Sequence, residues 1–140
     1  FMDRGLTGQA APDFTLNTTE NNNVNFTQYR NGQKAIVFFW ATWCPHCRTQ
    51  LKGLNEKKDQ LAKENIKLVL ISVGEDKKQV ENHLNKNKID MESFLDEQGQ
   101  LESKYQLVGV PTLYFITEEG KVGAVGHTLP DDYQALLTTK

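Results

Sequence analysis

Seven consecutive apolar residues at positions 35–41 run almost directly into the pentapeptide WCPHC at positions 43–47. A run that is apolar at every position is typical of a strand buried on both faces of a covered sheet. Residues 48–64 follow with leucines at helical spacing among charged residues, which predicts an amphipathic helix. A buried strand, a short loop and a helix in this order favour a fold in which helices cover an internal sheet.

Further elements alternate along the chain in the same manner. Residues 66–73 form a second apolar run, and Asp76 with Gln79 three residues later matches a capping box that opens a helix. We expect the remaining elements as follows: an N-terminal hairpin from 13–16 and 24–26, a loop at 27–34, a short strand at 94–95, a hairpin from 112–117 and 121–126, and helices at 76–87, 97–105 and from 130 onward.

This order of strands and helices predicts an α/β fold with a mixed central β-sheet flanked by helices and an N-terminal β-hairpin extension. A chain of 140 residues has the size of one domain, so we expect residues 1–140 to form a single domain. Residues 1–7 are the exception. We expect them to be disordered or to be an artificial addition, because Phe1-Met2 is an unusual start.

The charge balance excludes several classes of partner. Sixteen basic and eighteen acidic residues leave a net charge of −2, so nothing indicates binding to nucleic acid or to an anionic membrane surface. No apolar run reaches the roughly eighteen residues that a transmembrane helix needs, and the first residues do not resemble a signal peptide. From these features the chain is expected to be cytoplasmic or to lack its targeting segment.

The two cysteines of the chain, Cys44 and Cys47, are spaced C-x-x-C at the start of the predicted helix. Unpaired N–H groups and the helix dipole favour an anion there, and the thiolate is the reactive form of cysteine. Cys47 lies one turn after Cys44 on the same helix face, so the pair can form and break a disulfide. Half of a zinc site is the alternative, but no second cysteine pair is present, and Arg48 replaces the histidine that haem attachment needs.

The segment FWATWCPHC at positions 39–47 resembles the active-site signature of the thioredoxin superfamily. The opening APDFTL at 11–16, the insert after Val73 and the GVPT segment at 109–112 are similar to the TlpA/ResA-like branch. The resemblance extends over nearly the whole chain. It implies a single thioredoxin-like domain, a three-layer sandwich, and an extracytoplasmic, often membrane-anchored, bacterial thiol–disulfide oxidoreductase.

The same resemblance assigns roles to individual residues. Cys44 would be the exposed nucleophile and Cys47 the buried resolving thiol, and Pro111 would be a cis-proline facing the disulfide. The backbone of residue 110 would pair with an extended substrate. The expected substrate contacts are Trp43, Pro45, Val110 and Pro111.

Two further side chains, His46 and Glu75, are expected to tune the thiol pKa and to help transfer protons. Glu75 matches the acidic residue that ResA-like proteins place near the cysteines, and Phe38 stands where ordinary thioredoxins keep a buried aspartate. A donor or cation at His46 beside the Cys44 thiolate would stabilise the reduced form.

We expect an enzyme, a TlpA/ResA-like reductase that exchanges its CPHC dithiol with protein substrates, for example in cytochrome c maturation. The Pro45-His46 dipeptide is that of the oxidising DsbA proteins, so a disulfide-forming oxidant is the alternative. A peroxiredoxin-type thiol peroxidase is a weaker alternative, because no proline precedes Thr42 and Arg48 falls within the helix. A non-enzymatic thioredoxin-like binding module is a further alternative. The intact C-x-x-C motif argues against it, because binding alone does not need two cysteines.

No metal, and no cofactor beyond the redox-active Cys44–Cys47 disulfide, is expected. The resemblance implies protein thiols or disulfides and a membrane electron-transfer protein as partners, no nucleic acid, and a monomer. It places the protein in the periplasm or at the outer face of the cytoplasmic membrane, with its targeting segment or anchor absent from this sequence; a cytoplasmic location is the alternative. The other two histidines, His83 and His127, are expected to be ordinary surface residues.

Overall fold

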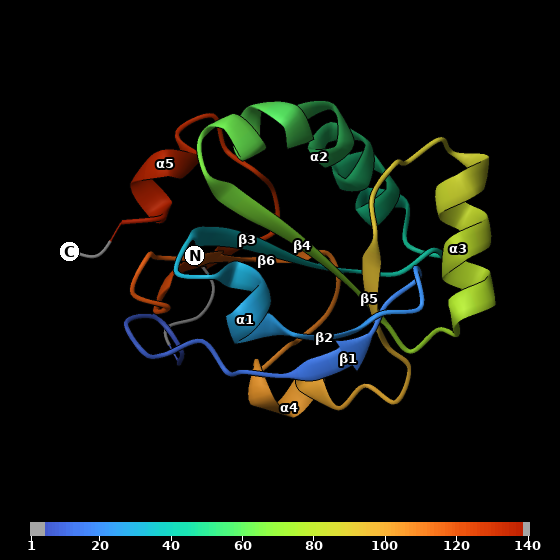
Figure 1. The fold of residues 1–140 in the computed structure, drawn as a ribbon, viewed down its shortest axis with the longest axis horizontal. Helices are drawn as coiled ribbons and strands as arrows, with labels where there is room; N and C mark the ends of the chain where they lie inside the picture. The colour runs from blue at the N-terminus through green and yellow to red at the C-terminus, as the bar shows by residue number, and fades with distance from the viewer. Residues whose placement is uncertain (1–4, 139–140) are drawn as a thin grey trace.

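The computed structural model describes residues 5–138 and contains a five-stranded mixed sheet in the order β5-β4-β3-β6-β7. Strands β3, β4 and β5 run parallel, β6 is antiparallel to β3, and β7 is antiparallel to β6. The cysteine motif therefore leaves the sheet from its central strand, β3 (Figure 1). The strands are β3 (Lys34–Trp40), β4 (Ile66–Val73), β5 (Ser93–Asp96), β6 (Thr112–Ile116) and β7 (Val122–Gly126).

Three helices cover one face of this sheet (Figure 1). They are α2 (Pro45–Lys63), α3 (Lys77–Lys86) and α5 (Tyr133–Leu136). Ile36, Phe38 and Trp40 of β3 belong to the core beneath these helices, together with Leu51 and Leu54 of α2. None of the helices within residues 5–138 is long and apolar enough to cross a membrane.

The N-terminal hairpin and two short helices cover the opposite face. They are β1 (Thr15–Asn17), β2 (Asn23–Asn25), α1 (Phe26–Arg30) and α4 (Leu101–Lys104). The alternate residues of β3, Val37 and Phe39, pack there with Phe14, Phe26 and Tyr105. The sheet is thus enclosed on both sides, and the predicted three-layer α/β fold with a mixed sheet and an N-terminal hairpin is confirmed.

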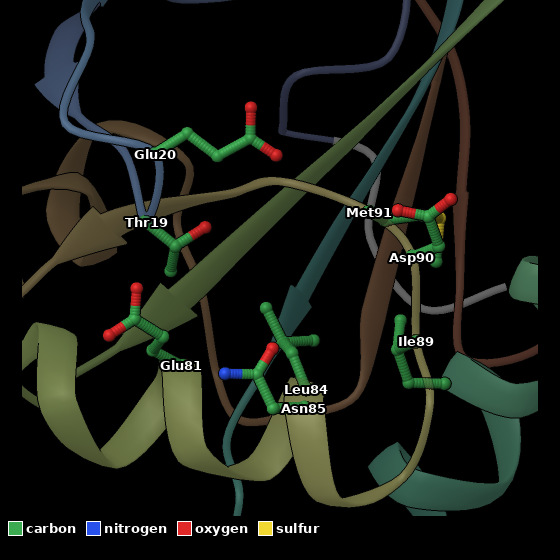
Figure 2. A pocket seen from close by; sticks show the side chains of 8 residues that line it. All are labelled: Thr19, Glu20, Glu81, Leu84, Asn85, Ile89, Asp90 and Met91. Atoms are coloured by element: carbon green, nitrogen blue, oxygen red, sulfur yellow. The ribbon is translucent and has the colours of Figure 1, made fainter.

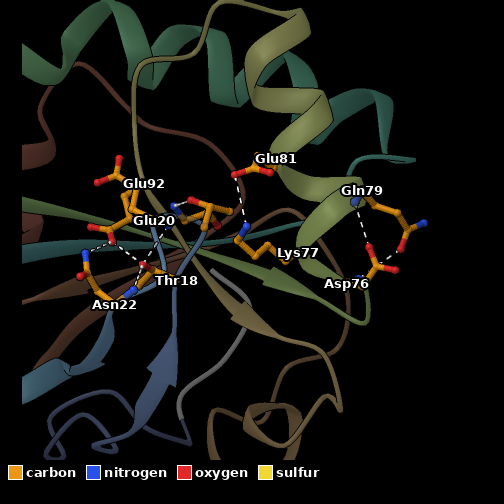
Figure 3. Close-up of polar contacts among 10 residues, drawn as sticks. Thr18, Glu20, Asn22, Asp76, Lys77, Gln79, Glu81 and Glu92 are labelled. Carbon is orange, nitrogen blue, oxygen red and sulfur yellow. Dashed lines mark hydrogen bonds and ion pairs between the residues drawn. The ribbon is translucent and has the colours of Figure 1, made fainter.

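Local sequence signals set several of these bounds. Strand β4 spans the residues predicted for it. The predicted capping box of α3 is also present. The Gln79 N–H donates to the Asp76 side chain over 2.9 Å, and the Asp76 N–H donates to the Gln79 side chain over 3.1 Å (Figure 3).

The turn of the N-terminal hairpin is held against the segment before β5, because the Thr18 hydroxyl donates to the Glu92 carboxylate (Figure 3).

Residues 26–30 form helix α1, where the sequence predicts the end of a strand at residue 26 and a loop from residue 27. Asn25 caps this helix by accepting a hydrogen bond from the Gln28 N–H over 3.0 Å. The Thr27 N–H donates a second hydrogen bond, also over 3.0 Å, to the side chain of Asp13, which lies fourteen positions before Thr27. The helix thus depends partly on a contact between residues far apart in the chain, which periodicity within 27–34 does not reveal.

The last two helices are shorter than the sequence predicts. Helix α4 begins later because Gly99 adopts a left-handed φ of 68° and the Asp96 carboxylate accepts a hydrogen bond from the Gln100 N–H over 2.9 Å. Helix α5 begins three residues after Pro130 and has no side-chain hydrogen bond at its N-cap.

Residues 5–7 contradict the prediction of a disordered start. Leu6 is buried, Thr7 forms a bridge with Val122 of β7, and the Gly8 N–H donates to the Val122 carbonyl over 2.7 Å. Pairing to a strand that lies more than a hundred residues away orders this segment. The rest of that prediction, which concerns residues 1–4, lies outside the described residues.

Candidate active site

Cys44 occupies the N-cap position of α2, at the end of the loop that leaves β3. Its Sγ accepts a hydrogen bond from the Cys47 N–H over 3.2 Å, and its thiol donates to the Val110 carbonyl oxygen, 3.7 Å away. Pro45 takes the first helical position, where its missing N–H costs nothing. An N–H group and the helix dipole thus face the sulfur, and both favour a negative charge on it.

Cys44 is not the exposed thiol that the sequence predicts, since only 4% of the residue is accessible to solvent. The cap geometry turns its Sγ inward, between the first turn of α2 and the Val110 carbonyl. Its chain neighbours face the solvent instead: Trp43 is 68% exposed, and Pro45 and His46 are exposed as well. A partner must therefore dock closely around the sulfur in order to react with it.

Cys47 lies in the first turn of α2 and is fully buried, as the resemblance implies. Burial raises the pKa of its thiol to about 12, and the hydrogen bond with Cys44 and the charges of Cys44 and Glu75 act in the same direction. Cys47 therefore keeps its proton at neutral pH. Neither Cys44 nor Cys47 forms a disulfide in this structure.

Glu75, buried between β4 and α3, binds the loop that carries the cysteines. Its Oε1 accepts a hydrogen bond from the Thr42 N–H over 2.8 Å, and its Oε2 accepts one from the Thr42 hydroxyl over 2.5 Å. The Arg48 side chain donates to the Thr42 carbonyl oxygen over 3.1 Å. Glu75 is thus an anchor for Thr42 and a negative charge close enough to influence Cys47. The Thr42 hydroxyl, which the peroxidase alternative requires, is bonded to this carboxylate.

The loop at residues 109–112 lies against Cys44 at the start of β6. Its Val110–Pro111 peptide bond is cis, as the resemblance implies. Three consecutive carbonyl groups of this loop are paired with side chains: Gly109 with the Thr112 hydroxyl (2.6 Å), Val110 with the Cys44 thiol (3.7 Å) and Pro111 with His127 Nδ1 (2.8 Å). The structure thus brings Val110, with Pro111 next to it in the chain, to Cys44 from 66 positions away.

Of the predicted tuning residues, His46 is exposed in the first turn of α2, and its role remains a prediction. His83 of α3 is not an ordinary surface residue, because it is half-buried with its ring centroid 5.6 Å from that of Trp40. Burial lowers the pKa of His83, the Arg48 cation lowers it further, and the Glu75 carboxylate opposes the shift. Two charged side chains that bind the cysteine loop, Arg48 and Glu75, therefore also influence the pKa of His83 on α3.

His127 also differs from the expectation of an ordinary surface residue. Its side chain is exposed, yet Nδ1 lies 2.8 Å from the Pro111 carbonyl oxygen. The C-terminal hairpin brings the two together, since Leu113 of β6 pairs with Gly126 of β7. The sequence predicts this hairpin. If its strand pairing is continued by one residue beyond Leu113 and Gly126, His127 falls opposite Thr112 of the GVPT segment, so the sequence held a signal for this contact.

A polar hollow between the N-terminal hairpin turn, α3 and the segment before β5 shares no residue with the cysteine site (Figure 2). It is lined by Thr19, Glu20, Glu81, Leu84, Asn85, Ile89, Asp90 and Met91. Its carboxylates do not converge: between residues 5 and 138, no three His, Cys, Asp or Glu side chains are placed to hold a metal ion. We therefore place the candidate active site at the cysteine pair.

A dithiol at the head of a helix, beside a cis-proline loop and above a mixed sheet, defines a thioredoxin-like redox site. Residues 7–125 match the AhpC/TSA family, and the chain belongs to that family. A thiol–disulfide oxidoreductase ResA from Geobacillus thermodenitrificans is 31% identical over 115 residues, which cover 82% of this chain and 66% of the relative. The chain thus spans about two thirds of the length of this relative.

Two solved structures have the same fold. StoA from Bacillus subtilis aligns with a TM-score of 0.71 at 26% identity, covering 84% of this chain and 88% of that chain. A thioredoxin family thiol:disulfide interchange protein from Chlorobium tepidum aligns with a TM-score of 0.77 at 24% identity, covering 96% of both chains. The predicted thioredoxin-like fold and the predicted class, thiol–disulfide oxidoreductase, are confirmed.

Proposed function

We propose that the chain is a reductase that exchanges its Cys44–Cys47 dithiol with the disulfides of protein substrates. The position of Cys44 carries this proposal, because its Sγ accepts the Cys47 N–H at the head of α2 and lies beside the Val110 carbonyl. A sulfur in that position is stabilised as the attacking thiolate, and a second thiol one turn away can complete the exchange.

In the reducing direction, the Cys44 thiolate attacks one sulfur of a substrate disulfide. The substrate S–S bond breaks, a mixed disulfide forms at Cys44, and the other substrate sulfur leaves as a thiolate that takes up a proton. Cys47 then loses its proton, attacks Cys44 Sγ and releases the second substrate sulfur, which is protonated in turn. The substrate gains two electrons and two protons, and the chain is left with a Cys44–Cys47 disulfide.

Deprotonation of Cys47 is the demanding step, because the pKa of its thiol is raised to about 12. We assign Glu75 to this proton transfer as well as to holding Thr42, since its buried carboxylate is close enough to influence Cys47. His46, exposed two positions after Cys44, would favour the Cys44 thiolate and so make the disulfide more oxidising.

The substrate contacts proposed are Trp43, Pro45, Val110 and Pro111. Trp43 exposes an apolar ring next to the reacting cysteine, and the Val110 carbonyl lies against the sulfur. When Cys44 gives up its proton, the hydrogen bond to the Val110 carbonyl is lost. That oxygen can then accept a backbone N–H from an extended substrate segment, which is how chains add to an exposed backbone edge.

The direction of electron flow has one alternative, because the Pro45-His46 dipeptide matches that of DsbA proteins. A DsbA-like enzyme would pass its disulfide to substrates instead of reducing them. Reduction potentials separate the two cases, at about −270 mV for thioredoxin and about −120 mV for DsbA. Equilibration with a glutathione redox buffer measures this value, and a potential near that of DsbA would reverse the proposed direction.

We further propose that residues 1–140 form a single domain that acts as a monomer outside the cytoplasm. A membrane electron-transfer protein would return electrons to its disulfide. The similarity of the 11–16, 39–47 and 109–112 segments to the TlpA/ResA-like branch supports this setting. Cytochrome c maturation is one process that such a reductase would serve.

Trapping tests the proposed activity directly. Cys47→Ala should hold a disulfide-containing peptide as a stable mixed disulfide through Cys44, and Cys44→Ser should capture none. With a chemical reductant in excess, each variant should lose turnover roughly a thousandfold, as when one member of a catalytic unit is removed. Full turnover by Cys44→Ser would exclude this function, and rapid peroxide consumption by the unmodified chain would favour the peroxidase alternative.

A further inference from the structure

The Pro111 carbonyl is bound by a side chain from a different strand. His127, which directly follows β7, places Nδ1 2.8 Å from this oxygen. A carbonyl oxygen can only accept a hydrogen bond, so Nδ1 carries the hydrogen. Both the neutral Nδ1-protonated ring and the imidazolium cation provide this donor.

The neighbouring carbonyl bonds of the loop differ in what holds them. The Thr112 hydroxyl donates to Gly109 from the first residue of β6, the strand that the loop itself enters, so this bond is local in the chain and adds no tie to a distant element. The Cys44 thiol donates to Val110 from the head of α2, but this bond requires the thiol proton. It is therefore absent whenever Cys44 is a thiolate or is joined in a disulfide. Of the three bonds, the one from His127 reaches another element and also survives the reaction.

We propose that His127 is a positioning residue for thiol–disulfide exchange. By holding the Pro111 carbonyl it keeps the backbone of Val110 in place for the substrate after the Cys44 thiol has lost its proton. This inference rests on the proposed function, because it assigns His127 to the substrate-binding side of the same site. His127 does not touch the reacting sulfur atoms, so it should affect how well an extended substrate binds more than how fast the sulfur reacts.

Matched variants test the assignment. The amide nitrogen of asparagine can occupy the position of Nδ1, whereas that of glutamine corresponds to Nε2. We expect His127→Ala and His127→Gln to raise KM for a disulfide-containing peptide by about three- to tenfold, the usual effect of one lost hydrogen bond. His127→Asn should stay within about twofold of the unmodified chain. Thr128→Ala, at the exposed neighbouring position, is the control and should change nothing.

Two further readouts separate positioning from a general structural role. Alkylation of Cys44 by a small reagent should proceed at the same rate in all four variants, because no extended substrate is involved. Nitrogen NMR of the unmodified chain should show Nδ1 of His127 protonated, a result that does not depend on activity or on any variant folding.

Three outcomes would overturn the inference: an unprotonated Nδ1, unchanged KM in His127→Ala, or retention of KM by His127→Gln but not by His127→Asn. Failure of the proposed function looks different. In that case the unmodified chain itself would not reduce the peptide, whatever residue occupies position 127.

Discussion

The two faces of the central sheet are built from different side chains. On the hairpin face, the rings of Phe14 and Phe26 stack at 4.9 Å, and Phe94 meets Phe14 edge-on at 5.5 Å. On the helical face, the core is mainly aliphatic, and it contains both cysteines. One sheet therefore carries an aromatic scaffold on one side and the reactive groups on the other.

This difference indicates a division of labour between stability and chemistry. On the hairpin face the Tyr105 hydroxyl donates to the Pro12 carbonyl over 2.5 Å, and burial raises the pKa of Tyr105 above its ordinary value. This hydroxyl is thus neutral and has a hydrogen-bond partner. On the helical face, Glu75 and Cys47 combine burial with charge or reactivity. We infer that the hairpin face holds the sheet in place and that the helical face performs the exchange.

The largest test of this comparison removes an aromatic ring from the hairpin face. Phe14→Ala should lower the free energy of unfolding by about 3–5 kcal/mol, because it leaves a cavity among stacked rings. Phe14→Leu should lose less, since it keeps an apolar side chain. Urea denaturation measures both. The reduction potential of the folded variants should stay the same, and a shift of about 30 mV, a tenfold change in equilibrium, would contradict the division between faces.

A smaller effect is expected on the helical side, where β7 meets α5. A Cβ added at Gly123 would lie 2.3 Å from the Leu136 carbonyl oxygen, so Gly123→Ala should cost about 1–3 kcal/mol. Gly53 in α2 has no atom within 4 Å of such a Cβ, so Gly53→Ala should instead gain about 0.5–1 kcal/mol. Thermal denaturation of the pair checks this. Equal changes in stability for the two variants would mean that α5 moves away from the added Cβ at no cost. That result would contradict tight packing between β7 and α5.

The effect that is smallest per step of one pH unit is the pH dependence that the buried Cys47 thiol of the helical face should show. The pKa of Cys47 rises from 9.0 to about 12 on folding, so the folded chain holds this proton more tightly than the unfolded chain. Its contribution to stability is complete below pH 9 and is lost as the pH rises toward 12. The slope is at most about 1.4 kcal/mol per pH unit.

Denaturation of the reduced protein at several pH values, compared with Cys47→Ala, isolates this term. The unmodified chain should lose stability above pH 9 faster than the variant, in which the buried thiol is absent. If stability fell with pH equally in the unmodified chain and in Cys47→Ala, the pKa of Cys47 would be the same in the folded and the unfolded chain. That result would contradict its burial in the helical core.

Predictions from the sequence succeeded where an element depends on its own residues. Strand β4 matches its predicted bounds, and the α3 capping box needs only Asp76 and Gln79. They failed where a distant contact decides. Helix α1 is held partly by Asp13, and Thr7 is placed by its bridge to Val122.

The candidate site divides in the same way. The sequence alone determined that two cysteines stand one turn apart at the head of a helix after a buried strand, because spacing, periodicity and capping are local properties. Only the tertiary structure decided that Cys44 is turned inward, that Glu75 binds Thr42 and that His127 holds Pro111. These contacts join residues far apart in the chain, and their energies exist only after the sheet has brought them together.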